Sequence, residues 1–157
     1  MITLLVLLQA FFFVFYIYYV IRTVGVQKSI SYSWYVVPNK GAFDMFTLGV
    51  GIPMMIYGAA LQNDLAGLSF VLAGFFMCGL GISIVVQQAK YVEIIHYICT
   101  GLTIIFSYLG IWLYFHDLIH LLFGAIGIPL ILKIHRNKLW WLEIWIFLCI
   151  ITKLIQL

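Results

Sequence analysis

The sequence predicts an all-α, polytopic bundle of six transmembrane helices with no soluble domain. Hydrophobic residues make up 66% of the chain and charged residues only 8%, whereas soluble domains carry roughly 25% charged residues. The mean hydropathy is +1.16. The apolar residues also fall in six continuous runs, each close to the roughly 20 residues that a helix needs to cross a bilayer.

The six runs predict the elements in order along the chain. They cover residues 2–21, 43–61, 65–86, 91–115, 118–134 and 139–157. Because they are continuous rather than alternating, they predict helices and not the strands of an outer-membrane barrel. Arg22 follows the first run instead of preceding it, so we expect this run to be a retained span and not a cleaved signal peptide. Residues 1–157 are therefore expected to form a single membrane domain.

The basic residues indicate an orientation. Seven of the eight Lys and Arg residues fall in the connections after the first, third and fifth runs: Arg22, Lys28, Lys40, Lys90, Lys133, Arg136 and Lys138. Lys153 alone lies on the other side. Since basic residues concentrate on the cytoplasmic side of membrane proteins, both termini are expected to be non-cytoplasmic.

The most ordered polar pattern lies in the run 91–115. Six residues recur there at spacings of three and four, which places them on one helical stripe. They are Glu93, His96, Thr100, Thr103, Ser107 and Gly110.

Two interpretations of this stripe remain open. Hydroxyl and small residues favour a seam where helices pack closely, because Ser and Thr can return a hydrogen bond to their own helix. Polar residues inside the membrane also mark hydrated paths and substrate clefts. In the second case Glu93 and His96 stand at the cytoplasmic mouth, where two titratable side chains suit proton handling.

A second cluster, His116, Asp117 and His120, follows the same run. The two histidines are four residues apart, so they share a face if the next helix begins early enough. Zinc needs three or four ligands, which Asp117 could help to supply. The alternative is that His116 and Asp117 form a water-facing turn in which Asp117 caps the fifth span. We predict no cofactor; zinc at this cluster is the alternative.

The connection after the first run contains Ser29, Ser31 and Ser33, and ends at Pro38. These serines alternate with larger residues, and a period of two predicts an extended segment whose Trp34 lies in the headgroup layer. Asp44 then opens the second span, either as its N-cap or as part of the polar cleft. A Ser/His/Asp hydrolase built from Asp44, His96 and one of these serines is a further alternative.

Two other features have structural interpretations. Glu143, one turn into the last run, is expected to form an ion pair with Lys133, Arg136 or Lys138. Small residues at helical spacing on the second and third runs predict close packing of these two helices. They are Gly51, Gly58, Gly67, Gly74, Cys78 and Gly81.

The Ile30-Ser31 pair with Ser33, the later Pro38 and the aromatic Phe43 opening the second helix form a short motif. This motif resembles the one after the first helix of Frag/DRAM/Sfk-type six-helix membrane proteins and related bacterial membrane proteins of unknown function. The resemblance implies a six-helix membrane fold and a role in lipid or membrane homeostasis. It implies no catalytic residues.

The leading functional hypothesis is a small, non-enzymatic multi-pass protein whose polar cleft handles a lipid, a small solute or protons. One alternative is a metal-dependent intramembrane hydrolase acting on a lipid-like substrate, and another is a structural or assembly subunit of a membrane complex. The expected partners are the bilayer and either further copies of the chain or a membrane complex. Nucleic acid is excluded because the basic residues do not cluster on one surface.

Overall fold

The computed structural model describes residues 1–62, 64–85, 92–134 and 136–157, and within these the chain is all-α, with seven helices and no strand. The side-chain surroundings of residues 64, 82–85, 92–93, 118–121, 123 and 134 lie outside this description. The helices are α1 (Ile2–Val24), α2 (Ile30–Val36), α3 (Gly41–Ala60), α4 (Asp64–Val85), α5 (Val92–Phe115), α6 (Leu118–Ile134) and α7 (Lys138–Leu154). The predicted all-α class is confirmed for the described residues.

Three helical segments are long and apolar enough to cross a membrane. They are Ile2–Val24, Gly41–Ala60 and Ile94–Phe115, with mean hydropathies of 2.4, 1.3 and 1.7. Leu65–Gly81 in α4 and Gly124–Lys133 in α6 are shorter apolar stretches. These segments are typical of a membrane protein.

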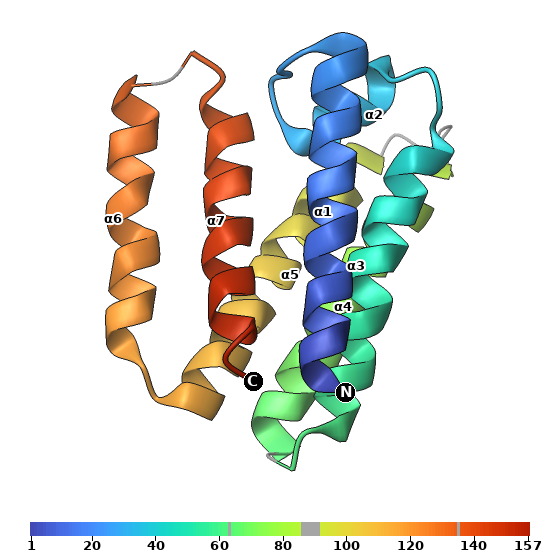
Figure 1. The fold of residues 1–157 in the computed structure, drawn as a ribbon. Helices are drawn as coiled ribbons and strands as arrows, with labels where there is room; N and C mark the ends of the chain where they lie inside the picture. Colours follow the sequence, from blue (N-terminus) through green and yellow to red (C-terminus); the bar gives the residue numbers. More distant parts are fainter. Residues whose placement is uncertain (63, 86–91, 135) are drawn as a thin grey trace.

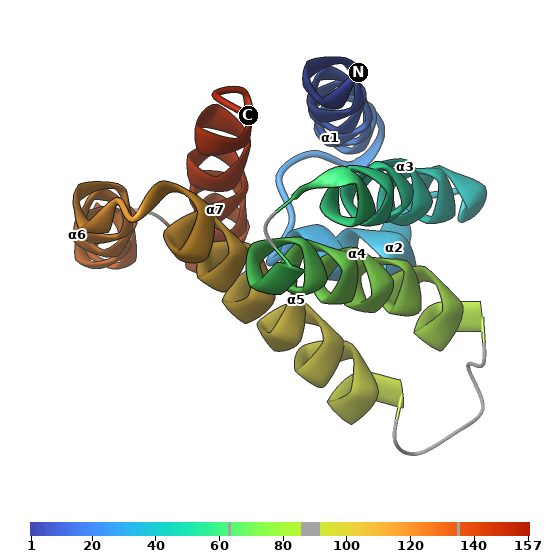
Figure 2. The same ribbon diagram turned by 90° about the horizontal axis from the view of Figure 1, so that it is seen from below.

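The long helices run alternately up and down, and the two chain termini lie at the same end of the bundle (Figure 1). Seen along the bundle, α1, α3, α4 and α5 follow one another as neighbours, and α7 lies between α5 and α1 (Figure 2). Helix α6 is the outermost and packs chiefly on α7. The long helices α1, α3, α4, α5 and α7 therefore surround the centre of the bundle, and α6 lies outside it.

The contact between α3 and α4 depends on glycine. A Cβ atom added to Gly51 would lie 2.6 Å from the carbonyl oxygen of Gly74, and one added to Gly58 would lie 2.8 Å from the carbonyl oxygen of Gly67. Backbone atoms of the facing helix occupy the space that a side chain at these glycines would need. Helices α3 and α4 can therefore approach this closely only because the residues between them are small. The packing predicted for this glycine stripe is confirmed.

Aromatic rings join α1 to α3 and α7. The rings of Phe13 and Phe147 stack with centroids 4.5 Å apart, and those of Tyr16 and Phe46 stack at 4.9 Å. Phe13, Tyr16 and Phe46 are almost completely buried. Such ring pairs add to the packing that holds α1 against both neighbours.

The extended segment predicted after the first span is wrong, because α2 is a helix. Ser29 is its N-cap, and its side chain accepts a hydrogen bond of 2.9 Å from the backbone N–H of Tyr32. The buried residues Ile30, Ser33 and Trp34 follow helical spacing rather than a period of two. The hydrogen bond of 2.6 Å between the hydroxyl groups of Ser33 and Tyr16 fixes α2 on α1.

Trp34 does not occupy the exposed position predicted for the headgroup layer. Its side chain is 5% exposed, whereas Tyr35 is 58% exposed. The ammonium group of Lys40 lies 4.9 Å from the centre of a Trp34 ring and donates to the carbonyl oxygens of Trp34 and Tyr35 at the end of α2. A cation at this position satisfies the last carbonyl groups of the helix.

Candidate functional site

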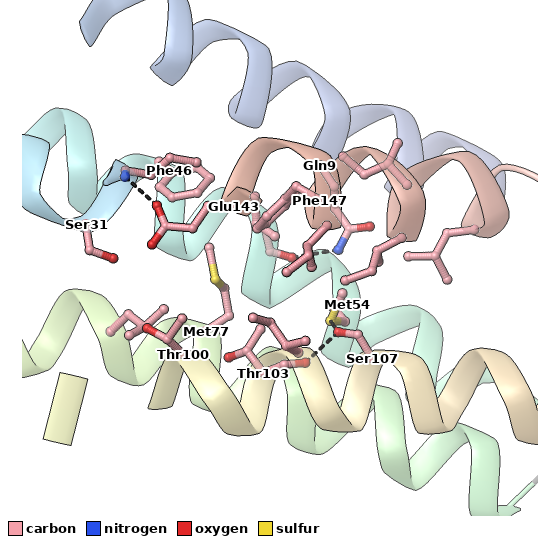
Figure 3. A pocket seen from close by; sticks show the side chains of 18 of the residues that line it. Gln9, Ser31, Phe46, Met54, Met77, Thr100, Thr103, Ser107, Glu143 and Phe147 are labelled. Carbon is pink, nitrogen blue, oxygen red and sulfur yellow. Dashed lines mark hydrogen bonds between the residues drawn. The ribbon is translucent and has the colours of Figure 1, made fainter. Parts of the chain in front are cut away.

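A pocket lies inside the bundle between α1, α2, α3, α4, α5 and α7. The cavity volume that water could occupy is about 60 Å³. The total empty volume, which includes the part open to the outside, is about 730 Å³. Its lining consists of Gln9, Ile30, Ser31, Phe43, Phe46, Val50, Met54, Met77, Leu80, Thr100, Thr103, Ile104, Ser107, Glu143, Ile146, Phe147, Ile150, Ile151 and Leu154. Most of these side chains are apolar, and a few polar ones face them across the pocket (Figure 3).

Three residues of the α5 stripe line this pocket. The Ser107 hydroxyl donates to the carbonyl oxygen of Thr103 at 2.7 Å, and the Thr100 hydroxyl donates to that of His96 at 2.9 Å. The Thr103 hydroxyl has no hydrogen-bond partner although its side chain is 7% exposed. The structure therefore brings Thr100, Thr103 and Ser107 to one cavity, where the buried Thr103 hydroxyl is without a partner.

The rest of the stripe lies elsewhere. His96 is not among the residues that line the pocket, and its buried Nε2 has no hydrogen-bond partner. A Cβ atom added to Gly110 would lie 2.8 Å from the Phe70 ring, so this end of the stripe is a packing seam with α4. The side chain of Glu93 lies outside the described residues.

Asp44 is not the N-cap of its helix. Lys40 holds that position, and Asp44 lies in the first turn of α3 with a buried Oδ1 that has no hydrogen-bond partner. The helix starts earlier than predicted because Gly41 and Ala42 also take helical geometry. Within the described residues, no hydrogen bond joins Asp44 or His96 to a serine, and neither of the two lines the pocket.

Of the three serines, only Ser31 lines the pocket. Ser29 caps α2, and Ser33 is completely buried between Tyr16 and its own helix. Pro38 lies between α2 and α3 and belongs to neither helix. The motif loop therefore serves mainly to shape α2, which covers one end of the pocket.

The sequence analysis missed one pocket residue, Gln9, and gave another, Glu143, a different role. Gln9 is 1% exposed; its amide N–H donates to the carbonyl oxygen of Val50 at 2.8 Å, while its Oε1 has no partner. An amide in the middle of an otherwise apolar span is a signal that could have identified it. Gln9 ties α1 to α3 and presents an acceptor at the pocket.

Glu143 was misassigned to an ion pair. Its carboxylate accepts the backbone N–H of Ile30, the first residue of α2, and it lines the pocket (Figure 3). No ion pair joins it to Lys133, Arg136 or Lys138 in the described part of the chain. The reason is tertiary: α2 folds over the start of α7, where the backbone N–H of Trp140 also donates to the carbonyl oxygen of Lys28 at 3.2 Å.

At the opposite end, Asp117 forms an ion pair of 2.8 Å with Lys153, whose ammonium group also lies 4.6 Å from the centre of the Phe115 ring. His116 is exposed and has a φ of 51°, where α5 ends. The side chain of His120 lies outside the described residues. Among the residues that are described, no three His, Cys, Asp or Glu side chains gather as a metal site would require.

The pocket thus combines an apolar wall with an acceptor at Gln9, a hydroxyl group at Thr103 and a carboxyl group at Glu143. Searches with family models, curated proteins and solved structures match no part of the chain, so these side chains are the evidence for what the pocket does.

Proposed function

We propose that the chain is a six-span membrane protein whose internal pocket binds the apolar chain of a lipid-like amphiphile. The observation that carries this proposal is the lining of the pocket, which is mainly aliphatic and aromatic with a few polar groups. Binding sites for small amphiphilic molecules have this composition. The resemblance to Frag/DRAM/Sfk-type proteins implies the broader role in lipid or membrane homeostasis, with which such binding agrees.

The length of the pocket agrees with an extended chain. Its α7 wall runs from Glu143 to Leu154, which corresponds to about 16 Å at the helical rise per residue. Between these two ends stand Ile146, Phe147 and Ile150. These side chains favour methylene groups over water, so the pocket suits a bound chain better than a continuous proton path.

Six spans are supported by the alternation of the helices. The termini lie at one end, as an even number of crossings requires, and α1, α3 and α5 meet the length and hydropathy of spans. Large hydrophobic side chains on the other helices are also exposed, including Phe75 of α4, Ile126 of α6 and Leu148 of α7. Surfaces this apolar are unfavourable in contact with water, and in a bilayer lipid would cover them.

The distribution of charge supports non-cytoplasmic termini. The basic connections after α1 and α6 lie at the end away from the termini. Lys153, the basic residue at the other end, is paired with Asp117 and so has its charge balanced. The uncompensated positive charge therefore belongs to one side, which we assign to the cytoplasm.

Cysteine labelling tests this orientation. In a background without Cys78, Cys99 and Cys149, a membrane-impermeant maleimide should label Gln156→Cys on intact cells and should label Tyr35→Cys only after permeabilisation. Both positions are exposed, so accessibility depends on the side of the membrane. Labelling of Tyr35→Cys but not Gln156→Cys on intact cells would reverse the proposed orientation, and labelling of both would contradict six spans.

Filling the pocket tests the binding function. Ile146→Phe should lower photolabelling of the α5 and α7 peptides by a diazirine-bearing dodecanol at least fivefold, because the larger ring occupies the space of the chain. Leu148→Phe is the matched control, since Leu148 is 43% exposed and does not line the pocket. Equal labelling of the wild type and Ile146→Phe would contradict binding in this pocket.

A further inference from the structure

Two buried polar atoms of the pocket lining, Gln9 Oε1 and Thr103 Oγ1, have no hydrogen-bond partner. Gln9 Oε1 can only accept; the amide nitrogen of Gln9 donates to the carbonyl oxygen of Val50, and the buried hydroxyl of Tyr57 lies beside the same side chain. Thr103 Oγ1 also lacks a partner, and as a hydroxyl it can either donate or accept. Both side chains are more than nine-tenths buried, and burying such a group without a hydrogen bond costs about 1–3 kcal/mol. A ligand that donates hydrogen bonds would remove this cost.

The ionisable residues of the pocket also favour a ligand that donates hydrogen bonds. Glu143 is the ionisable residue of the lining, and no Lys, Arg or His is among the described residues that form it. One Glu143 oxygen accepts the N–H of Ile30, and the carboxyl group borders the end of the pocket near α2 (Figure 3). Because burial works against the charge of Glu143, an anionic head placed there would gain no ion pair and would favour the protonated carboxyl group, whereas an ammonium group would be attracted to the carboxylate and stabilise it.

The polar atoms also have an order along the bundle. On α7, Phe147 follows Glu143 by one turn, and its ring stacks on Phe13 of α1. Helix α1 runs in the opposite direction, so Gln9, one turn before Phe13 in the chain, lies one turn further from Glu143. Gln9 is therefore about two turns, or roughly 11 Å, below Glu143. The head of a ligand at Glu143 would thus have its chain directed past Phe147 toward Gln9 and Leu154.

We infer that the pocket selects single-chain amphiphiles whose head is a hydrogen-bond donor without negative charge, an aliphatic amine first and an alcohol second. The head binds the Glu143 carboxylate, and the chain runs along α7. Fatty acids and lipids with a single phosphate head are disfavoured. This inference rests on the proposed function, because it specifies the head of the chain that the pocket holds.

Three photoprobes with the same diazirine-bearing dodecyl chain test it: the primary amine, the alcohol and the carboxylate. The protein is placed in phosphatidylcholine nanodiscs, and labelling of the α5 and α7 peptides is measured by mass spectrometry after subtraction of the Ile146→Phe background. We expect the amine to label the wild type at least tenfold more efficiently than the carboxylate, with the alcohol between them.

The variants assign this preference to Glu143. Glu143→Gln keeps an oxygen that can accept the Ile30 N–H but removes the charge, and should lower the amine-to-carboxylate ratio at least tenfold. Glu143→Asp keeps the charge and should retain a ratio above one, which decides the question if Glu143→Gln fails to fold. Asp44→Asn removes a carboxylate that does not line the pocket and should leave the ratio unchanged.

The outcomes separate the inference from the proposed function. Equal labelling by all three probes, still reduced by Ile146→Phe, would overturn the selection of the head and leave chain binding intact. A ratio that is unchanged in Glu143→Gln would overturn the role of Glu143. No pocket labelling by any probe would overturn both proposals.

Discussion

Gly51→Ala is expected to destabilise the protein by about 2–3 kcal/mol, because overpacking a tight helix contact costs typically 1–3 kcal/mol. The new methyl group would lie 2.6 Å from the carbonyl oxygen of Gly74 and 3.1 Å from the backbone nitrogen of Cys78. These are backbone atoms of α4, so the clash is relieved only when α3 and α4 move apart. Chemical unfolding in mixed micelles, followed by circular dichroism, measures the change.

Gly101→Ala is the matched control for this prediction. Gly101 is also a helical glycine, but a Cβ atom added to it meets no other atom within 4 Å. Alanine should therefore be neutral there or stabilising by up to about 1 kcal/mol through its higher helix propensity. If Gly51→Ala were as stable as Gly101→Ala, α3 and α4 could not pack as closely as the structure has them.

Asp117→Asn is expected to lower the free energy of unfolding by about 2 kcal/mol, which lies between the contributions of exposed and of fully buried ion pairs. The side chain of Lys153 is 11% exposed and that of Asp117 30% exposed, so asparagine would leave a largely buried ammonium group without its carboxylate. The Phe115 ring remains 4.6 Å away and compensates only in part. The midpoint of thermal unfolding in detergent should fall accordingly.

A double variant separates charge from packing in this prediction. Asp117→Asn combined with Lys153→Met removes the unpaired charge and should recover most of the lost stability, because a buried pair is often replaced by apolar groups at little cost. A double variant as unstable as Asp117→Asn alone would show that the ion pair does not account for the loss.

The helices themselves were largely predictable. The run at 118–134 has the predicted limits of α6, and the other long helices differ from prediction by a few residues at their ends. An apolar run long enough to cross a bilayer forms a helix because its backbone must satisfy its own hydrogen bonds, and this requirement is local. The close approach of Gly51 to α4 was also predictable from spacing alone.

The short segments were less predictable. The alternation of Ser29, Ser31 and Ser33 suggested an extended segment, yet Ser29 is an N-cap and Ser33 belongs to a buried helical face. A segment of seven residues is short enough to fit both the period of two of an extended segment and the 3.6-residue period of a helix. Contacts with the rest of the bundle therefore decide which of the two forms. Asp44 shows the same limit, since its helix begins three residues before it, at Gly41.

For the candidate site, the sequence was sufficient to place Thr100, Thr103 and Ser107 on one face, because helical periodicity is a property of the segment itself. Only the tertiary structure decided that this face meets Gln9 and Glu143, which come from opposite ends of the chain. Their meeting depends on α7 packing between α1 and α5 and on α2 folding over Glu143. Such contacts join residues that are remote in sequence, and no local pattern encodes them.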